Sequence, residues 1–414
     1  MTAPRGFLAL PGPGDDTARA LADRLPTIAF RRFVAADRRG LAAATARALQ
    51  ALQRALYELA TRDPGARAAI GRAFADLDVQ SAALALDAPP PIAEDAVRTL
   101  GPRLVVALAD HGVRAPLAWP LPFTTLADPT RDRALTFTPA ATAIGLGRDG
   151  AIVTLAGGVA WPLDAAPPAG VAARVAFHPV SDALPALRLA EVDGNPLRVV
   201  EAHPDKAGNA LELGGRPVAA WTDALADALA LIAAAVPTLP AELAVTLRRI
   251  VPVGVDDERH LSCSYREAPG LVYLSLHPNP LTMAEALVHE TQHAKLNALS
   301  WQDPILDNPP EQLVDSPARP DPRPVMGVLL AVHAFVPVAA LHAGLAALDH
   351  AITRDPWFAR RRRDVLAGNA EGLAVLAAHA RPTPTGARVI AALAAMHDEL
   401  VAAAPAAPAA PAAP

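Results

Sequence analysis

The chain has 414 residues, which is enough for two domains or for one large domain with a substantial core. Hydrophobic residues make up 52% of it and charged residues 19%, with alanine supplying much of the apolar share, so we expect a helix-rich soluble protein. The formal net charge of −5 gives no electrostatic reason to expect nucleic acid or an anionic membrane as partner. The single cysteine, Cys263, excludes an internal disulfide and suits the cytoplasm.

The N-terminal part of the chain combines helical and strand patterns. From about residue 15 to residue 77 the apolar residues recur at helical spacing. Between roughly 135 and 200, short apolar runs such as Ala151–Leu155 are separated by Gly, Pro and Asp, which is typical of strands and turns. We therefore expect a mixed helical and β region over residues 1–180. The first residues lack the apolar core of a signal peptide, and no transmembrane span is expected.

Residues 181–403 are expected to form a metal-binding catalytic domain that is mainly helical. The patterns predict strands at 245–253 and 270–276 and helices at 222–235, 325–351, 358–381 and 385–403. The basic run Arg360–Arg363 is expected to be a solvated helix face, and the Ala-Pro repeat of residues 404–414 a disordered tail. The predicted fold class is α+β: a mixed N-terminal region, then a mainly helical metal-binding domain with a strand beside the motif helix.

The strongest motif is H-E-x-x-H, formed by His289, Glu290 and His293. On a helix this spacing turns both imidazoles to one face, where two nitrogens can take adjacent positions on one metal ion. Thr282 and Glu285 have the spacing of a capping box just before the motif, which indicates where the helix begins. We therefore predict that His289 and His293 bind a divalent metal.

A third ligand must come from elsewhere in the chain. His333 lies in an apolar stretch that predicts a core helix, where a neutral imidazole needs a partner such as a metal or a carbonyl. Glu311, supported by Asp315, is the competing choice, as in a thermolysin-like zinc protease, although the prolines around it favour a loop. For His342 and His350 we expect solvent-facing or capping roles. The extension that marks metzincins does not follow His293.

Two blocks of sequence resemble the HExxH-type, 2-oxoglutarate-dependent peptide β-hydroxylases that modify ribosomally made peptides. The first is Leu287-Val-His-Glu-Thr-Gln-His-Ala-Lys-Leu. The second is Arg319-Pro-Asp-Pro-Arg-Pro, followed by Gly327-Val-Leu-Leu-Ala-Val-His-Ala-Phe. Thr383-Pro-Thr-Gly386 is similar to a further element of the family. The resemblance covers about residues 262–403, and it departs from the family at Leu330, where the family often carries a histidine.

The resemblance implies an Fe(II) oxygenase with 2-oxoglutarate as cosubstrate. Iron would be held by His289, His293 and His333, and a side-chain β-carbon of a precursor peptide would be hydroxylated. Such an enzyme also needs a fixed cation for the distal carboxylate of 2-oxoglutarate. The candidates are Arg323 and Arg319, and Arg323 is preferred because it directly precedes the helix that bears His333.

The role expected of Glu290 differs between the functions that remain open. In an oxygenase it would orient a ligand or position a water. In a zinc metallopeptidase with His289, His293 and Glu311 as ligands, it would be the general base that activates the zinc-bound water. A peptide-binding scaffold that keeps the metal only as a structural ion is the third alternative.

Overall fold

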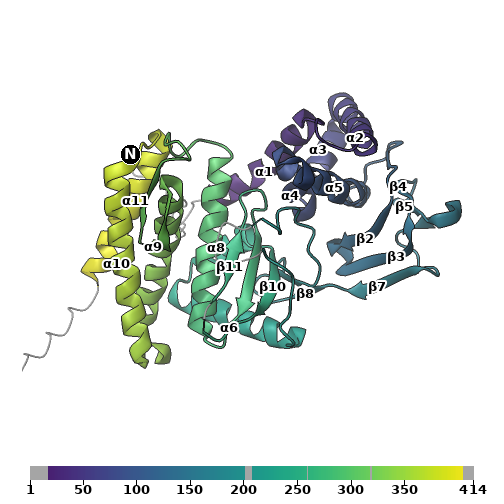
Figure 1. Cartoon of the computed structure of the whole chain (residues 1–414). Coiled ribbons are helices and arrows are strands. Elements are labelled where there is room, and N and C mark those ends of the chain that lie inside the picture. The colour runs from purple at the N-terminus through teal and green to yellow at the C-terminus, as the bar shows by residue number, and fades with distance from the viewer. Residues whose placement is uncertain (1–16, 201–207, 259, 318, 404–414) are drawn as a thin grey trace, which may run out of the picture. The chain divides into compact units, whose positions relative to one another are not determined.

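A computed structural model describes residues 17–200, 208–258, 260–317 and 319–403 (Figure 1). Within this part of the chain, eleven α-helices and four β-sheets confirm the predicted α+β class. The predictions for the first residues and for the tail at 404–414 lie outside the described residues. Contacts divide the chain into two compact units. One consists mainly of Asp227–Leu243 and the described residues after Asn279, and the other of the described residues within Arg19–Ala226 and Ala244–Pro278.

The second of these units is the α+β unit, and most of it precedes the motif. Its helices are α1 (Thr17–Ala35), α2 (Ala43–Arg62), α3 (Pro64–Ala73), α4 (Leu77–Leu84) and α5 (Pro90–Asp110). Its strands are β1 (Ala118–Trp119), β2 (Phe123–Asp128), β3 (Arg133–Ala141), β4 (Ala143–Leu146), β5 (Ala151–Thr154), β6 (Ala160–Pro162), β7 (Val171–Val175), β8 (Phe177–Pro179), β9 (Arg188–Ala190), β10 (Arg249–Val255), β11 (Ser262–Ser264) and β12 (Leu271–Leu276). The strands predicted at 245–253 and 270–276 are therefore confirmed as β10 and β12.

Three sheets make up the β part of this unit. Two are antiparallel, with the orders β1-β4-β5-β6 and β2-β3-β7, and the third is mixed, with the order β11-β12-β10-β9-β8. In the mixed sheet β12 pairs in parallel with β10, and all six of its residues are buried, so its sequence, apolar except for Ser275, is that of an interior strand. The core around this sheet includes Phe177, Val251 and Tyr273.

The metal-motif unit is a helical layer centred on α9 (Val325–Ala347), which packs against the motif helix α8 (Pro280–Ser300), α10 (Pro356–His379) and α11 (Pro384–Ala402) (Figure 1). These helices confirm the ranges predicted from the sequence to within a few residues. Two further helices, α6 (Val218–Ala235) and α7 (Leu239–Thr246), run through Asp227–Leu243. Lys295 of α8 forms a buried ion pair with Glu242 of α7, which fastens this segment to the motif helix.

Two helices, α6 and α9, are long and apolar enough to cross a membrane by length and composition. The α9 window is 78% buried inside the protein, which is the behaviour of a core helix, and the α6 window is 33% buried. Core helices of soluble proteins meet the same criterion, so these two helices are compatible with a soluble protein.

The prolines around Glu311 predict a loop with one short turn over residues 308–317, and this prediction is wrong for the second half of that stretch. There β13 (Leu313–Ser316) pairs with β14 (Arg319–Pro324) in a two-stranded antiparallel ribbon. The prolines of β14 stand at every second position, so the intervening residues keep their backbone N–H groups and can pair with β13. A strand with a partner on one side only tolerates this pattern.

The start of α8 also differs from the sequence prediction. The capping box of Thr282 and Glu285 does not form, because the helix begins three residues earlier with Pro280 at its first position. The N-cap is Asn279, whose Oδ1 accepts a hydrogen bond of 2.9 Å from the backbone N–H of Leu281. Proline is favoured at the first helical position and asparagine at the cap, so this earlier start satisfies the local chemistry better.

The Thr383–Gly386 element closes the end of the helical layer. The Thr383 hydroxyl caps α11 by accepting from the N–H of Gly386 at 3.1 Å, and it donates to the carbonyl of Pro304 at 2.7 Å. The segment that leaves α8 passes so close that a Cβ on Gly386 would lie 1.9 Å from the carbonyl oxygen of Ile305. Only glycine fits at this position.

We expect Gly386→Ala to destabilise the protein by about 3 kcal/mol, because the added methyl group forces the α8 exit away from α11. Chemical denaturation followed by circular dichroism measures the change. Gly368→Ala is the matched control, since a Cβ on this helical glycine meets nothing within 4 Å and alanine favours the helix. Equal stability of the two variants would contradict the assigned contact.

Candidate metal site

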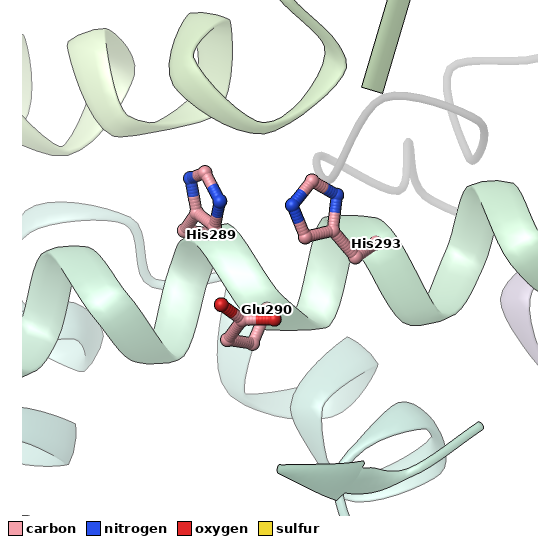
Figure 2. A group of neighbouring side chains, drawn as sticks. All are labelled: His289, Glu290 and His293. Carbon is pink, nitrogen blue, oxygen red and sulfur yellow. The ribbon is translucent and has the colours of Figure 1, made fainter. Parts of the chain in front are cut away.

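His289 and His293 lie one turn apart near the middle of α8, and Figure 2 shows their imidazoles extending from the same side of the helix. The ring centroids are 4.4 Å apart and the ring planes meet at 81°. Both side chains are half-buried. This is the arrangement that the H-E-x-x-H spacing predicts, with two ring nitrogens close enough to share one ion.

Glu290 completes a group of three potential ligands. One ligand atom from each of His289, Glu290 and His293 lies within 4.8 Å of the other two. Glu290 is 2% exposed, so its carboxylate is a buried charge that requires nearby donors or cations. Two imidazoles and one carboxylate are ligand types that both zinc and iron accept.

The surroundings of His293 keep its imidazole neutral. Burial lowers the pKa of His293 below the ordinary value, and the positive charge of Arg323 lowers it further, while the negative charge of Glu290 raises it. A neutral imidazole has a free electron pair for a metal, so the ligand form prevails near neutral pH. The effect also shows that Arg323 is close enough to His293 for the two to interact electrostatically.

Arg323 is positioned by the β13–β14 ribbon and by the first turn of α9. Arg323 pairs with Val314 across the ribbon, and its side chain lies over Gly327, where a built Cβ would stand 3.2 Å from the guanidinium Nε. The other predicted anion-binding residue, Arg319, pairs with Ser316 in the same ribbon. The side chain of Arg319 lies outside the described part of the structure.

His333 lies on α9, is 1% exposed, and is not a member of the group that His289 forms with its neighbours among the described residues. The α9 residue seen to contact the motif is Phe335, whose ring centroid lies 4.7 Å from that of His289 at an interplanar angle of 64°. Sequence reasoning missed Phe335, because one aromatic residue in an apolar helix carries no signal of its own. The assignment of His333 as third ligand stays a prediction.

A buried carboxylate one turn before His289 was also missed. Oε1 of Glu285 is 2.7 Å from Nε2 of His342 on α9, and Oε2 of Glu285 accepts two hydrogen bonds from Arg361 of α10, at 2.9 and 2.6 Å. Because His342 is fully buried, the solvent-facing or capping role expected for it is wrong. Arg361 likewise departs from the solvated face predicted for the basic run, since it holds this carboxylate and lies 5.8 Å from the ring of Phe335.

The residues of the competing ligand set lie elsewhere. Glu311 is exposed in the turn before β13, and Asp315 is exposed within that strand. Neither belongs to the group of ligand atoms found among the described residues. His350 caps a short 3₁₀ helix by accepting from the N–H of Ile352 at 3.3 Å, which confirms a capping role.

The three side chains fit a metal ion. The Nδ1 atom of His293 is buried and has no hydrogen-bond partner in the described structure, and one ligand atom from each of the two imidazoles and the carboxylate lies within 4.8 Å of the other two. His289, Glu290 and His293 could therefore hold a metal, whose type the donor set alone does not determine.

No protein family model and no curated protein matches this chain. The resemblance to the peptide β-hydroxylases therefore stays a prediction from the motif residues of the sequence.

We expect one zinc ion to bind per chain, and we expect His289→Ala and His293→Ala each to lower the affinity at least about 100-fold, because each removes a metal–ligand bond. Competition with a chromophoric chelator measures the affinity. The control is His379→Ala, which removes an exposed imidazole at the end of α10. An unchanged affinity in both motif variants would exclude this site.

We expect Glu285→Gln to destabilise the protein by about 2–3 kcal/mol at neutral pH, because it leaves Arg361 without its buried counter-charge. Hydrogen bonds from His342 and Arg361 lower the pKa of Glu285 below its ordinary value of 4.5, although burial opposes them. The stabilisation is then complete above pH 4.5 and is lost as the pH falls through the lowered pKa.

Denaturation of the wild type and the Glu285 variant at a series of pH values tests this dependence. The difference in unfolding free energy should shrink at acid pH, where the wild-type carboxyl is also neutral. Glu371→Gln, an exposed substitution on α10, serves as control and should change stability by less than about 0.5 kcal/mol at every pH. A difference that stays constant down to low pH would refute a charged Glu285.

Proposed function

We propose that the chain is an Fe(II)- and 2-oxoglutarate-dependent oxygenase that hydroxylates a side-chain β-carbon of a ribosomally synthesised peptide in the cytoplasm. The observation that carries the proposal is the group formed by His289, Glu290 and His293, with the positive charge of Arg323 acting on His293. A dicarboxylic cosubstrate that reaches the metal through one end needs a fixed cation for the other end. The resemblance of both motif blocks to the peptide β-hydroxylases supports the same function.

Each residue of the site has a role in this proposal. His289 and His293 would hold the iron, with either Glu290 or His333 as the further protein ligand. Arg323 would bind the distal carboxylate of 2-oxoglutarate by two parallel hydrogen bonds. Phe335 would support the His289 ring through the edge-type contact between them. With both cofactors bound, O₂ supplies one oxygen atom to 2-oxoglutarate, which leaves as succinate and CO₂, and the other to the substrate C–H bond.

Anaerobic reconstitution with Fe(II), followed by addition of 2-oxoglutarate, tests the cosubstrate. We expect the weak visible charge-transfer band of chelated 2-oxoglutarate, and succinate once O₂ is admitted. Arg323→Met should weaken 2-oxoglutarate binding about 10- to 100-fold, because a charge-assisted pair of hydrogen bonds is lost. Arg363→Met, which removes an exposed guanidinium from α10, should leave binding unchanged. Equal 2-oxoglutarate affinity in these two variants would remove the role of Arg323.

Two variants identify the third ligand when their affinity for Fe(II) is measured by competition with a chelator. Loss of iron affinity in His333→Ala, with Glu290→Gln tolerated, supports a site with three histidines. The opposite result supports the two-histidine, one-carboxylate set that is common among iron oxygenases.

A zinc metallopeptidase is the second candidate, and the position of Glu290 favours it. The carboxylate is buried and lies within 4.8 Å of the ligand atoms of both histidines, where a general base of a zinc hydrolase would act on a bound water. If no charge-transfer band forms, zinc copurifies at one equivalent, and Glu290→Gln abolishes peptide cleavage, the hydrolase is the function.

A further inference from the structure

A cavity of about 220 Å³ lies between α9 and α10 and is separated from the metal group by a single aromatic ring. Phe335 lines the cavity, and the same ring contacts His289. On α10 the lining residues recur at three- and four-residue spacing from Arg361 to Asn369, so the cavity follows one face of that helix for about 12 Å. Figure 1 shows the two helices side by side.

Part of the cavity exists because the lining face of α10 has no side chain near its C-terminal end. Gly368 lies there, and a Cβ added to it would meet nothing within 4 Å. One turn later the helices are in contact, since a Cβ on Gly372 would stand 2.5 Å from Cγ2 of Val332. The space therefore begins where the helices separate, and it is not an extension of loose packing along the whole interface.

The walls are mainly apolar and carry one unsatisfied hydrogen-bond donor. Ala331, Val332 and Val365 line the cavity together with Phe335. Asn369 also lines it, is 2% exposed, and has a side-chain Nδ2 that is buried without a hydrogen-bond partner among the described residues. Because this Nδ2 is shielded from the cavity, the surface that an occupant would meet is mainly apolar.

The charged residues at the rim do not favour an anion. Arg361 is engaged by two hydrogen bonds to Glu285, so its charge is already compensated. Asp364 is exposed and carries the remaining negative charge. An uncharged apolar group matches this lining, and a large apolar side chain of a peptide is such a group. A cavity of 150 Å³ holds benzene, so 220 Å³ accommodates a leucine or phenylalanine side chain.

We propose that this cavity binds a large apolar side chain of the peptide substrate. That the partner is a peptide rests on the proposed function. The occupant would sit against the far face of Phe335. The His289 and Phe335 rings are 4.7 Å apart, and a further ring contact adds about 5 Å, so the anchor lies at most about 10 Å from the His289 ring. An extended chain advances about 3.3 Å per residue, which places the anchoring residue within about three positions of the modified one.

The test uses three probes, N-acetyl-leucinamide, N-acetyl-phenylalaninamide and N-acetyl-glycinamide, with protein free of iron and 2-oxoglutarate. Saturation-transfer NMR should show the first two binding with dissociation constants in the low-millimolar range, as expected for ligands of about a dozen heavy atoms, and no binding of the glycine analogue.

Gly368→Leu should lower the affinity for the leucine and phenylalanine probes at least about tenfold by filling the cavity, and Gly368→Ala should lower it about threefold. If Gly368→Leu does not fold, the affinity of Gly368→Ala for the same probes tests the proposal. Gly71→Leu is the matched control, since Gly71 of α3 is also a helical glycine with nothing near its built Cβ, and it should bind as the wild type does.

The proposal would be overturned if the wild type bound none of the probes, or if both Gly368 variants bound the apolar probes as tightly as the wild type does. Because the assay needs neither metal nor cosubstrate, a failed iron reconstitution cannot produce that result. Conversely, an intact charge-transfer band in protein that binds no apolar probe would leave the oxygenase standing and remove this cavity as its peptide anchor.

Discussion

The helical unit depends on one buried carboxylate, Glu285. A charge inside a protein is costly unless it is paired, and this one is paired from two other helices, by His342 of α9 and Arg361 of α10. Glu285, His289 and His293 follow one another at four-residue intervals, so they lie on one stripe of α8. Fastening Glu285 to both helices therefore fixes the rotation of α8 and the direction in which the two imidazoles point.

The same contacts connect the metal group to the cavity. Arg361 binds Glu285 with its nitrogens and faces the ring of Phe335, which in turn contacts His289 on one side and lines the cavity on the other. One residue thus serves as counter-charge for the helix that carries the motif and as part of the wall beside it. An occupant that moved the Phe335 ring would also displace the His289 ring that it contacts, without any larger rearrangement of the helices.

Local features of this fold could be predicted from sequence, and features made by distant residues could not. The motif helix, the strands β10 and β12 and the three C-terminal helices follow from periodicity and short spacing. Glu285 is separated from His342 by 57 residues and from Arg361 by 76, so no spacing reveals their contact. Sequence reasoning does not find the β13–β14 ribbon, because prolines usually indicate a loop. Prolines at alternate positions nevertheless leave the backbone N–H groups of the residues between them free to pair along one edge of the strand.

The donor set of the site accepts more than one metal, so the function depends on what else surrounds it. Glu290 and Arg323 act on His293 with opposite sign, the carboxylate favouring the charged imidazole and the guanidinium the neutral one. A hydrolase would use the first residue and a 2-oxoglutarate oxygenase the second. The ribbon holds the backbone of Arg323 in a short strand whose proline neighbours restrict it, and the side chain lies over Gly327 of α9. A guanidinium held there beside the metal group suits the role proposed for Arg323, which is to bind the distal carboxylate of 2-oxoglutarate.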